Sequence, residues 1–341
     1  MSKINILLFF LILTGCQEYN SKVKPIVFKD EIFVTGTAVI RDKLIDYSYL
    51  LEQYGNYLIF LNFRNNGVVK ILDKNSGEII YDGVRFGDGP NEILIPISIY
   101  VDQITSKVYI QDGGTNSIKF ICFDNIIDES ADFETINLPS TGDRIFPVFP
   151  TGNNFLGITL DKNKEIFEFN NKGISDTLVK FEKSKIQLPD NIYGIPFEGK
   201  YGISRNKKFI LKGELYNSRI TLFDLKSRSS QIFESNASDV FKDSFDEKLG
   251  RYELDPLRIY HYASVKEYDN KFFLLYSGIG IKENEVVLKG NEIHVLDLND
   301  YSFRKIILDK YITDFVFDSD KNVIYGLNFT DMNPVYKFYI N

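Results

Sequence analysis

The feature that most constrains the fold is an apolar, strand-like run that ends in Asp or Asn and recurs along the chain. Successive endings are spaced by 51, 46, 54, 73 and 44 residues, and they are Asp73, Asp124, Asn170, Asp224, Asp297 and Asn341. The runs alternate apolar and polar residues with a period near two, which predicts strands rather than helices. A repeat of about 40–50 residues with about four strands is typical of a propeller blade. Six endings therefore predict an all-β chain folded as a six-bladed β-propeller.

The clearest single repeat lies between residues 57 and 81. Apolar runs are separated there by short polar turns that contain Asn66-Gly67 and Ser76-Gly77. Glycine at these positions supplies the positive φ that tight hairpins need. The repeat therefore predicts an antiparallel meander. Aromatic residues make up 15% of the chain, and this share of strand-forming residues supports a large β core.

The last repeat lacks one strand, because only three apolar runs lie between residue 312 and the last residue of the sequence. The segment 31–40 precedes the first complete repeat and belongs to no repeat of its own. We expect it to pair as the outer strand of the last blade, which closes the ring and covers exposed sheet edges. Residues 28–341 then form one propeller. The spacing of 73 residues marks an insertion at about residues 235–256.

The insertion contains the one stretch with a helical pattern. Phe241, Phe245 and Leu249 would share one face of a helix. Ser238 can cap its start and Gly250 can end it. We therefore expect a short helix, which either covers the channel or packs against the next blade.

The N-terminus predicts export and attachment to a membrane. Residues 13–16 read Leu-Thr-Gly-Cys after a short apolar run that begins beyond Lys3. This arrangement is typical of a secretory signal, and the four residues resemble a bacterial lipobox. We expect residues 1–15 to be a lipoprotein signal peptide and residues 16–27 to be a lipidated Cys16 with its tether. The protein would then reach the membrane through the Cys16 acyl anchor.

Beyond the signal, no apolar stretch approaches the roughly 20 residues that a membrane-spanning helix needs. Gln17 stands where Asp would favour retention at the inner membrane. We therefore expect an outer-membrane lipoprotein of the cell envelope, and its periplasmic or surface orientation stays open.

The charge balance excludes one class of partner. The chain has 40 Lys and Arg against 47 Asp and Glu, and loss of Lys3 with the signal gives 39 minus 47, or −8. Nucleic-acid binding needs a basic face, so no nucleic-acid partner is expected. With Cys16 lipidated, Cys122 has no partner for an internal disulfide. Its apolar surroundings at 117–123 predict a small buried core residue.

A short motif follows the first repeat. Residues 86–92 read Phe-Gly-Asp-Gly-Pro-Asn-Glu. They resemble the G-x-G-P-x-E signature of six-bladed, TolB-like propeller lipoproteins of gut-type Gram-negative anaerobes, although many members have Gly in place of Asn91. The resemblance covers about residues 40–341 and implies fold and location far more than activity. Taken alone, the glycines permit unusual φ, and Glu92 can accept backbone N–H bonds, so a structural turn is the simpler explanation.

Candidate ligand contacts come from the links between blades. Such links cross one face of a propeller near the channel mouth, and long structured links tend to carry function. Three links stand out, at 87–92, 186–196 and 235–256, and the last is followed by a run that leads into an inner strand. The ligand-face candidates are Asp88, Asn91, Glu92, Tyr193, Arg258, Tyr260 and His261.

Signatures of catalysis are weak. The two histidines, His261 and His294, do not have the H-x-x-x-H spacing of a metal site, and no G-x-S-x-G elbow occurs. No catalytic or metal-binding residue is therefore nominated, and the cofactor stays unknown. The sequence favours a non-catalytic binding or scaffold module for a protein, peptide or glycan. Two alternatives stay open: a channel-site hydrolase or lyase that could depend on calcium, and an accessory subunit of an outer-membrane transport complex.

Overall fold

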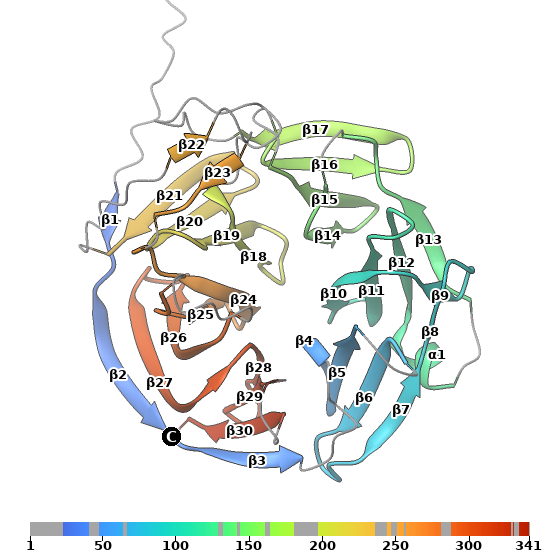
Figure 1. Ribbon diagram of the computed structural model, residues 1–341, viewed down its shortest axis with the longest axis horizontal. Coiled ribbons are helices and arrows are strands. Elements are labelled where there is room, and N and C mark those ends of the chain that lie inside the picture. Colours follow the sequence, from blue (N-terminus) through green and yellow to red (C-terminus); the bar gives the residue numbers. More distant parts are fainter. Residues whose placement is uncertain are drawn as a thin grey trace, which may run out of the picture.

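The computed structural model describes residues 23–40, 48–63, 67–128, 132–141, 144–160, 164–180, 197–235, 244–246, 251–255, 257–280, 288–328, 330 and 334–340. Within these residues, six sheets stand side by side around a central channel (Figure 1). The predicted all-β, six-bladed propeller is confirmed.

Each blade is an antiparallel sheet of four strands. Counted from the channel outward, blade one contains β4 (Ser48–Tyr54), β5 (Tyr57–Asn62), β6 (Val69–Asp73) and β7 (Ile79–Gly83). Blade two contains β10 (Pro96–Asp102), β11 (Lys107–Asp112), β12 (Ser117–Cys122) and β13 (Glu134–Asn137). Blade three contains β14 (Val148–Thr151), β15 (Asn154–Ile158), β16 (Ile166–Asn170) and β17 (Gly173–Val179).

The second half of the ring repeats this order. Blade four contains β18 (Gly199–Ile203), β19 (Phe209–Glu214), β20 (Arg219–Asp224) and β21 (Ser229–Glu234). Blade five contains β24 (Tyr262–Tyr268), β25 (Lys271–Tyr276), β26 (Gly290–Asp297) and β27 (Phe303–Ile312). Blade six contains β28 (Asp314–Asp318), β29 (Val323–Leu327), β30 (Val335–Tyr339) and β3 (Gly36–Ile40).

The recurring Asp and Asn residues mark the ends of the third strands for a local chemical reason. Four of them are the last residues of their strands, namely Asp73, Asn170, Asp224 and Asp297. Their side chains accept backbone N–H bonds from the turn that follows; Asp73 Oδ1, for example, lies 2.7 Å from the Asn75 nitrogen. This Asx-turn chemistry joins the third strand to the fourth. Asp124 falls just beyond β12, and Asn341 lies outside the described residues.

The N-terminal segment runs along the outer rim of three consecutive blades. β1 (Lys24–Pro25) pairs in parallel with β21 of blade four, and β2 (Phe28–Val34) pairs in parallel with β27 of blade five. β3 then pairs antiparallel with β30 and supplies the missing strand of blade six. The predicted closure is confirmed, but the closing strand is shorter than the expected 31–40. Lys24–Pro25, expected within the tether, is part of a blade edge.

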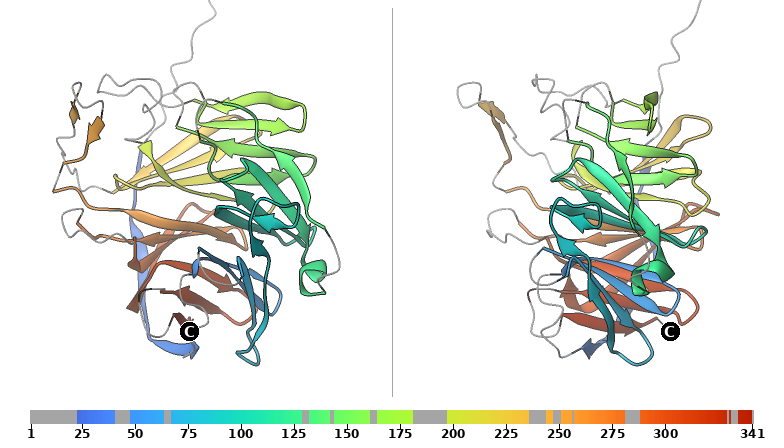
Figure 2. Two further views of the ribbon diagram at one scale, coloured as in Figure 1. Left: turned by 45° about the vertical axis from the view of Figure 1, so that its right-hand side comes forward. Right: turned by 90° about the vertical axis from the view of Figure 1, so that its right-hand side faces the viewer.

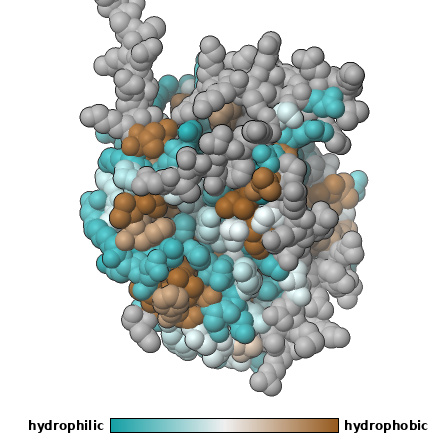
Figure 3. Space-filling view, turned by 60° about the vertical axis from the view of Figure 1, so that its left-hand side comes forward, coloured by the Kyte–Doolittle hydropathy of each residue, from teal (hydrophilic) through white to brown (hydrophobic). Residues whose placement is uncertain are grey.

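This segment, which we call the rim strap (β1 to β3), leaves some apolar side chains in solvent. Phe33 is 74% exposed and Val27 is 64% exposed. Seen from the side of blades four and five, apolar residues form separate patches among polar ones (Figure 3).

The hydrophobic core is divided among the contacts between blades. Six clusters of buried apolar side chains lie one between each pair of neighbouring blades, including blades six and one. Leu51 of β4 and Val316 of β28, for example, share one cluster and are both fully buried. Each blade therefore depends on both of its neighbours. The ring is closed by packing as well as by strand pairing.

Four smaller strands and one helix lie outside the blades. β8 (Arg85–Phe86) and β9 (Glu92–Ile93) pair in parallel in the link between blades one and two, and α1 (Phe123–Ile127) follows β12. β22 (Ser244–Asp246) and β23 (Arg251–Glu253) pair antiparallel and project beyond the blades (Figure 2). Among the described residues, none of the helical structure is long and apolar enough to cross a membrane.

Two local expectations are wrong. Residues 244–246, placed in a helix by the sequence pattern, form one strand of the β22–β23 hairpin. Three apolar residues at helical spacing were a weak signal, and Phe and Tyr on opposite sides of Gly250 suit a hairpin equally well. Cys122 is exposed rather than buried, because it ends β12 at the point where the chain turns into α1. The other residues of the expected helix, 238–243 and 247–250, lie outside the described part.

Candidate functional site

The central channel of the described structure holds a cavity of about 630 Å³. The inner strands begin at one end, which we call the link face because the links between blades lie there. Short turns join each inner strand to the second strand at the opposite end, which we call the turn face. Five of the six inner strands, β4, β10, β18, β24 and β28, line the cavity along much of the channel. The sixth, β14, contributes Phe149 near the link face.

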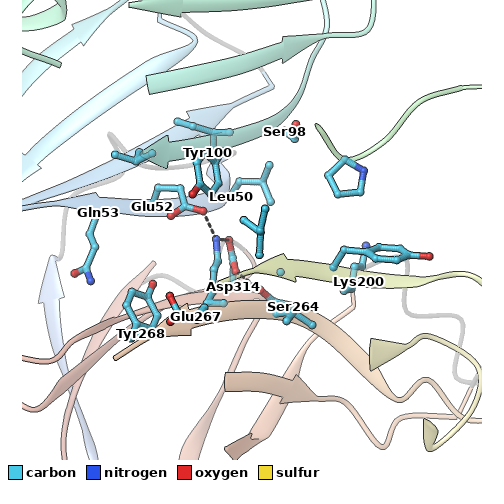
Figure 4. Close-up of a pocket in the computed structure, with 18 of the residues that line it drawn as sticks. Leu50, Glu52, Gln53, Ser98, Tyr100, Lys200, Ser264, Glu267, Tyr268 and Asp314 are labelled. Atoms are coloured by element: carbon cyan, nitrogen blue, oxygen red, sulfur yellow. Dashed lines mark hydrogen bonds and ion pairs between the residues drawn. The ribbon is translucent and has the colours of Figure 1, made fainter. Parts of the chain in front are cut away.

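A buried ion cluster joins the neighbouring blades five, six and one at one wall of the channel. Lys266 Nζ of β24 lies 2.6 Å from Glu52 Oε1 of β4 and 3.6 Å from Asp314 Oδ2 of β28 (Figure 4). The same ammonium donates to the Leu51 carbonyl at 2.9 Å. Burial alone would lower the pKa of Lys266, but Asp314 and Glu52 raise it above its ordinary value, so the side chain stays charged.

The Asp314 carboxylate is saturated with partners of its own. It accepts hydrogen bonds from the Leu51 nitrogen at 2.8 Å, the Ser264 hydroxyl at 2.6 Å and the Phe315 nitrogen at 2.9 Å. Leu51 belongs to blade one and Ser264 to blade five. Together with Lys266, these contacts hold blade six to both neighbours. The cluster is therefore part of the ring closure.

Two further lysines toward the turn face, Lys74 and Lys207, are also paired. Lys74 Nζ lies 2.6 Å from Asp318 Oδ2, and both side chains are less than a tenth exposed. Lys207 lies 3.7 Å from Asp102 and also donates to the Tyr100 hydroxyl. Each pair links residues of different blades. These charges support the ring, and their pairing leaves them little capacity to bind a ligand.

Lys200 differs from these lysines. It is the second residue of β18, lines the link-face half of the cavity, and is partly buried. Within the described residues, its ammonium makes no hydrogen bond or ion pair. Burial lowers the pKa of Lys200, and Glu198 and Asp314 oppose that effect from beyond contact distance. Figure 4 shows it on the strand of blade four, apart from the Glu52 side chain.

The link-face half of the cavity is otherwise largely apolar. The residues that line it there include Leu50, Ile97, Phe146, Pro147, Phe149 and Leu288. Ser98 is also present, and its hydroxyl donates to Gln111. Apolar walls with few polar groups, at one end of a cavity of about 630 Å³, have the character of a small-molecule site. Over the described ranges, no group of three or more His, Cys, Asp or Glu side chains is placed to hold a metal ion.

The motif at residues 86–92 lies at the outer rim rather than over the channel (Figure 1). Glu92 Oε2 accepts the Gly89 N–H at 3.1 Å, as expected, and a side chain at Gly87 would collide with the same carboxylate. Asn91 bonds Asp132 at 2.5 Å and the Phe133 nitrogen at 3.0 Å. Neither Asp88, Asn91 nor Glu92 lines the cavity. A ligand role for these residues stays a prediction.

Arg258, Tyr260 and His261 lie before β24 and are not among the residues that line the channel cavity. They are wedged between loops of blades four and five: Arg258 donates to the Asn217 side chain at 3.0 Å, and the His261 nitrogen donates to the Leu215 carbonyl at 2.8 Å. The inner strand begins only at Tyr262, so these residues precede its channel-lining part. Their contact with a ligand stays a prediction. Tyr193 and Cys16 lie outside the described residues.

Lys200 and the ion cluster of Glu52, Lys266 and Asp314 were not predicted from the sequence. All four belong to inner strands, where a single charged residue in an apolar run is easily taken for a solvent-facing position. The one local signal is the pair of glycines around Lys200, at 199 and 202. A side chain at Gly202 would collide with Val265 of blade five, so this strand approaches its neighbour closely.

Comparisons with known proteins identify the fold. No family model matches the sequence, and no curated protein matches it. A structure of a DUF4221 family member from Bacteroides vulgatus is 11% identical, with a TM-score of 0.60 over 90% of this chain and 96% of that one. A protein from Bacteroides fragilis described as exported is 11% identical, with a TM-score of 0.54 over 90% and 98%.

A third structure, of a protein of unknown function from Bacteroides thetaiotaomicron, is 13% identical, with a TM-score of 0.52 over 87% of this chain and 70% of that one. Identities this low show a shared fold alone. The propeller implied by the resemblance to the TolB-like lipoproteins is confirmed. Membership of that family and the lipid anchor stay predictions.

Proposed function

We propose that this chain is a non-catalytic binding module of the cell envelope that takes its ligand into the link-face half of the central channel. The observation that carries the proposal is the channel cavity of about 630 Å³, whose link-face half has largely apolar walls and the Lys200 ammonium, which has no partner among the described residues. A cavity of this size accommodates a small molecule or the end of a peptide or glycan chain. A protein partner would contact it through such an end. No nucleic-acid partner is proposed.

The state of the polar groups supports binding rather than catalysis. General acid–base chemistry needs a titratable group that is free to reach the substrate. Glu52, Asp314 and Lys266 are instead held by one another, by backbone groups of blades one and six, and by the Ser264 hydroxyl of blade five. Moving any of them during a reaction would disturb the ring closure. Rigid walls with fixed partners suit recognition of a ligand that leaves unchanged.

The proposed location is the cell envelope, with the chain attached to the outer membrane through Cys16. The support comes from the lipobox at residues 13–16 and from Gln17. The similar structure from Bacteroides fragilis is of a protein described as exported, which is consistent with this location. The rim strap begins close behind this anchor, so the propeller would lie near the membrane surface.

The proposal is tested by native mass spectrometry of the purified protein after incubation with an extract of the cells that produce it. We expect a discrete bound mass on the wild type. Ser98→Trp should abolish it, because the indole would fill the cavity. Thr135→Trp, on the exposed face of β13, is the matched control and should retain it. Unchanged binding by Ser98→Trp in a folded protein would refute the channel as the site.

The fate of the captured ligand separates binding from catalysis. Recovery of the ligand unchanged after long incubation supports the binding module. Conversion of the ligand, with or without a dependence on added calcium, would instead favour the hydrolase or lyase. Co-purification of a transport complex after mild crosslinking, with no small ligand bound, would favour the accessory subunit.

A further inference from the structure

We propose that Lys200 binds the carboxylate of an organic acid with an apolar body, seated in the link-face half of the channel. This inference rests on the proposed function and names the class of ligand. Three features support it: the Lys200 ammonium has no partner among the described residues, the nearby carboxylates are engaged by other groups, and the walls around it are apolar.

The nearby carboxylates cannot serve as partners for Lys200. Asp314 already accepts three hydrogen bonds and faces Lys266, and it lies beyond contact distance from Lys200. Glu198 interacts with the Tyr216 hydroxyl, and it too acts on Lys200 only through space. The two carboxylates favour the charged form of Lys200, but among the described residues neither forms a hydrogen bond or ion pair with its ammonium. Three lysines of the described chain line the cavity, namely Lys74, Lys200 and Lys266. Lys74 and Lys266 have carboxylate partners, whereas Lys200 has no hydrogen bond or ion pair among the described residues.

An ammonium held in this way is a recognition element. Removing a charged group from water costs free energy unless a partner replaces the lost hydration. In this channel, the replacement can be water or an anionic group of a ligand. A ligand carboxylate gains a charge-assisted hydrogen bond, which is about twice as strong as a neutral one. A single ammonium suits one carboxylate, and a phosphate would need more donors than the described residues offer there.

The walls around Lys200 define the rest of the ligand. Phe149, Leu50 and Ile97 line the same half of the cavity, and so does Phe146, which is 39% exposed. Further along the channel, toward the turn face, the Lys266 and Lys74 ammonium groups are already paired. The polar groups of an acid with a polar body would lose their hydration next to these apolar side chains without gaining hydrogen bonds, which costs free energy. An aliphatic or aromatic body gains free energy from the same contact.

Two sources provide this chemistry, namely a fatty acid and the C-terminal end of an apolar peptide. Octanoate and N-acetyl-phenylalanine represent them, and octanamide and N-acetyl-phenylalanine amide are the neutral counterparts of similar shape. Isothermal titration calorimetry at low salt measures the affinity of each probe for the full chain. We expect at least one acid to bind about 10-fold or more tightly than its amide, which is the size of one charge-assisted hydrogen bond. The pair with the larger preference identifies the source.

The variants connect this preference to one side chain. Lys200→Met, which keeps the length and removes the charge, should lose the preference for the acid and leave amide binding unchanged. Lys200→Arg should retain the preference. Lys172→Met, in the exposed β16–β17 turn, is the control for a simple change of net charge and should behave as the wild type.

Three results would overturn the inference: equal binding of acid and amide by the wild type, binding of neither acid at millimolar concentration, or a full acid preference in Lys200→Met. If Lys200→Met does not fold, the comparison of acid with amide on the wild type decides alone. The proposed function is tested independently of this inference, by the capture of a ligand from the cell extract. Capture of a ligand from the extract that Ser98→Trp abolishes would preserve the channel site even where both acids fail.

Discussion

Removal of the Lys266 ammonium should destabilise the propeller more than any other single charge deletion in the channel. In Lys266→Met, the Glu52 and Asp314 carboxylates face each other without the cation that lies 2.6 Å and 3.6 Å from them. Breaking a buried ion pair by removing one partner costs about 3–5 kcal/mol. Lys266 and Glu52 are 14% and 15% exposed to the channel, so some screening remains. We therefore expect a loss of about 3 kcal/mol in the free energy of unfolding.

The measurement is urea unfolding followed by far-ultraviolet circular dichroism, with the midpoint and slope compared between variants. Lys29→Met is the matched control, because the Lys29–Asp300 pair has the same chemistry at 2.8 Å with side chains 57% and 53% exposed. Exposed pairs contribute about 0–1 kcal/mol, so this variant should change little. Glu52→Gln combined with Lys266→Met should recover part of the loss, since one uncompensated charge is removed. Equal midpoints for Lys266→Met and Lys29→Met would refute the reasoning.

Three further predictions concern other parts of the molecule. Burial lowers the pKa of His261 from 6.5 to about 4, so the unfolded chain binds more protons than the folded chain between these pH values. The free energy of unfolding should therefore fall by about 3 kcal/mol as the pH drops from 6.5 to 4. In His261→Phe, the urea midpoint should depend less on pH over that range. Deletion of residues 28–40 removes β2 and β3, and the loss of a cooperative thermal transition should follow; a truncated chain that melts like the parent would contradict the closure. Cys16→Ser should move the protein from the membrane to the soluble fraction with an unchanged circular dichroism spectrum, and continued membrane fractionation would indicate another anchor.

The parts of the fold that could be predicted are those set by local chemistry. Asp73 and Asp224 end their strands because each carboxylate accepts N–H groups of the next turn, and that requirement is visible as a residue type at a regular spacing. Glu92 was predictable in the same way, since its partner at Gly89 is three residues distant. A hydrogen bond between residues two or three positions apart can be predicted from the residue types within a short stretch of sequence.

Features that depend on distant contacts were predicted poorly. The rim strap was expected to serve one blade, yet β2 adds a parallel strand to blade five before β3 reaches blade six. Which sheet edge a strand joins is set by the register of partners nearly 300 residues away, and alternation alone does not specify it. The β22–β23 hairpin was mistaken for a helix because a three-residue stripe satisfies both patterns.

The channel site was not predicted because the sequence does not indicate whether a charged residue is buried or which partners surround it. Lys200, Lys266 and Lys74 look alike in the sequence, each within or beside an apolar strand. The structure separates them by their partners: Lys266 and Lys74 have carboxylates at 2.6 Å, whereas Lys200 has none in contact among the described residues. That distinction arises because blades one, five and six exchange charged contacts with one another whereas Lys200 lies on blade four, and no short stretch of sequence contains these contacts.

The ring is closed at two radii, and this arrangement bears on where a ligand can bind. At the rim, β3 pairs with β30; at the axis, Lys266, Glu52 and Asp314 join blades five, one and six. The charges on this wall of the channel are therefore committed to the fold, and a ligand that competed for them would weaken the closure. Lys200 projects from blade four, which the rim strap supports only at its outer edge through β1. A ligand held by Lys200 can thus bind without drawing on any contact that keeps the propeller closed.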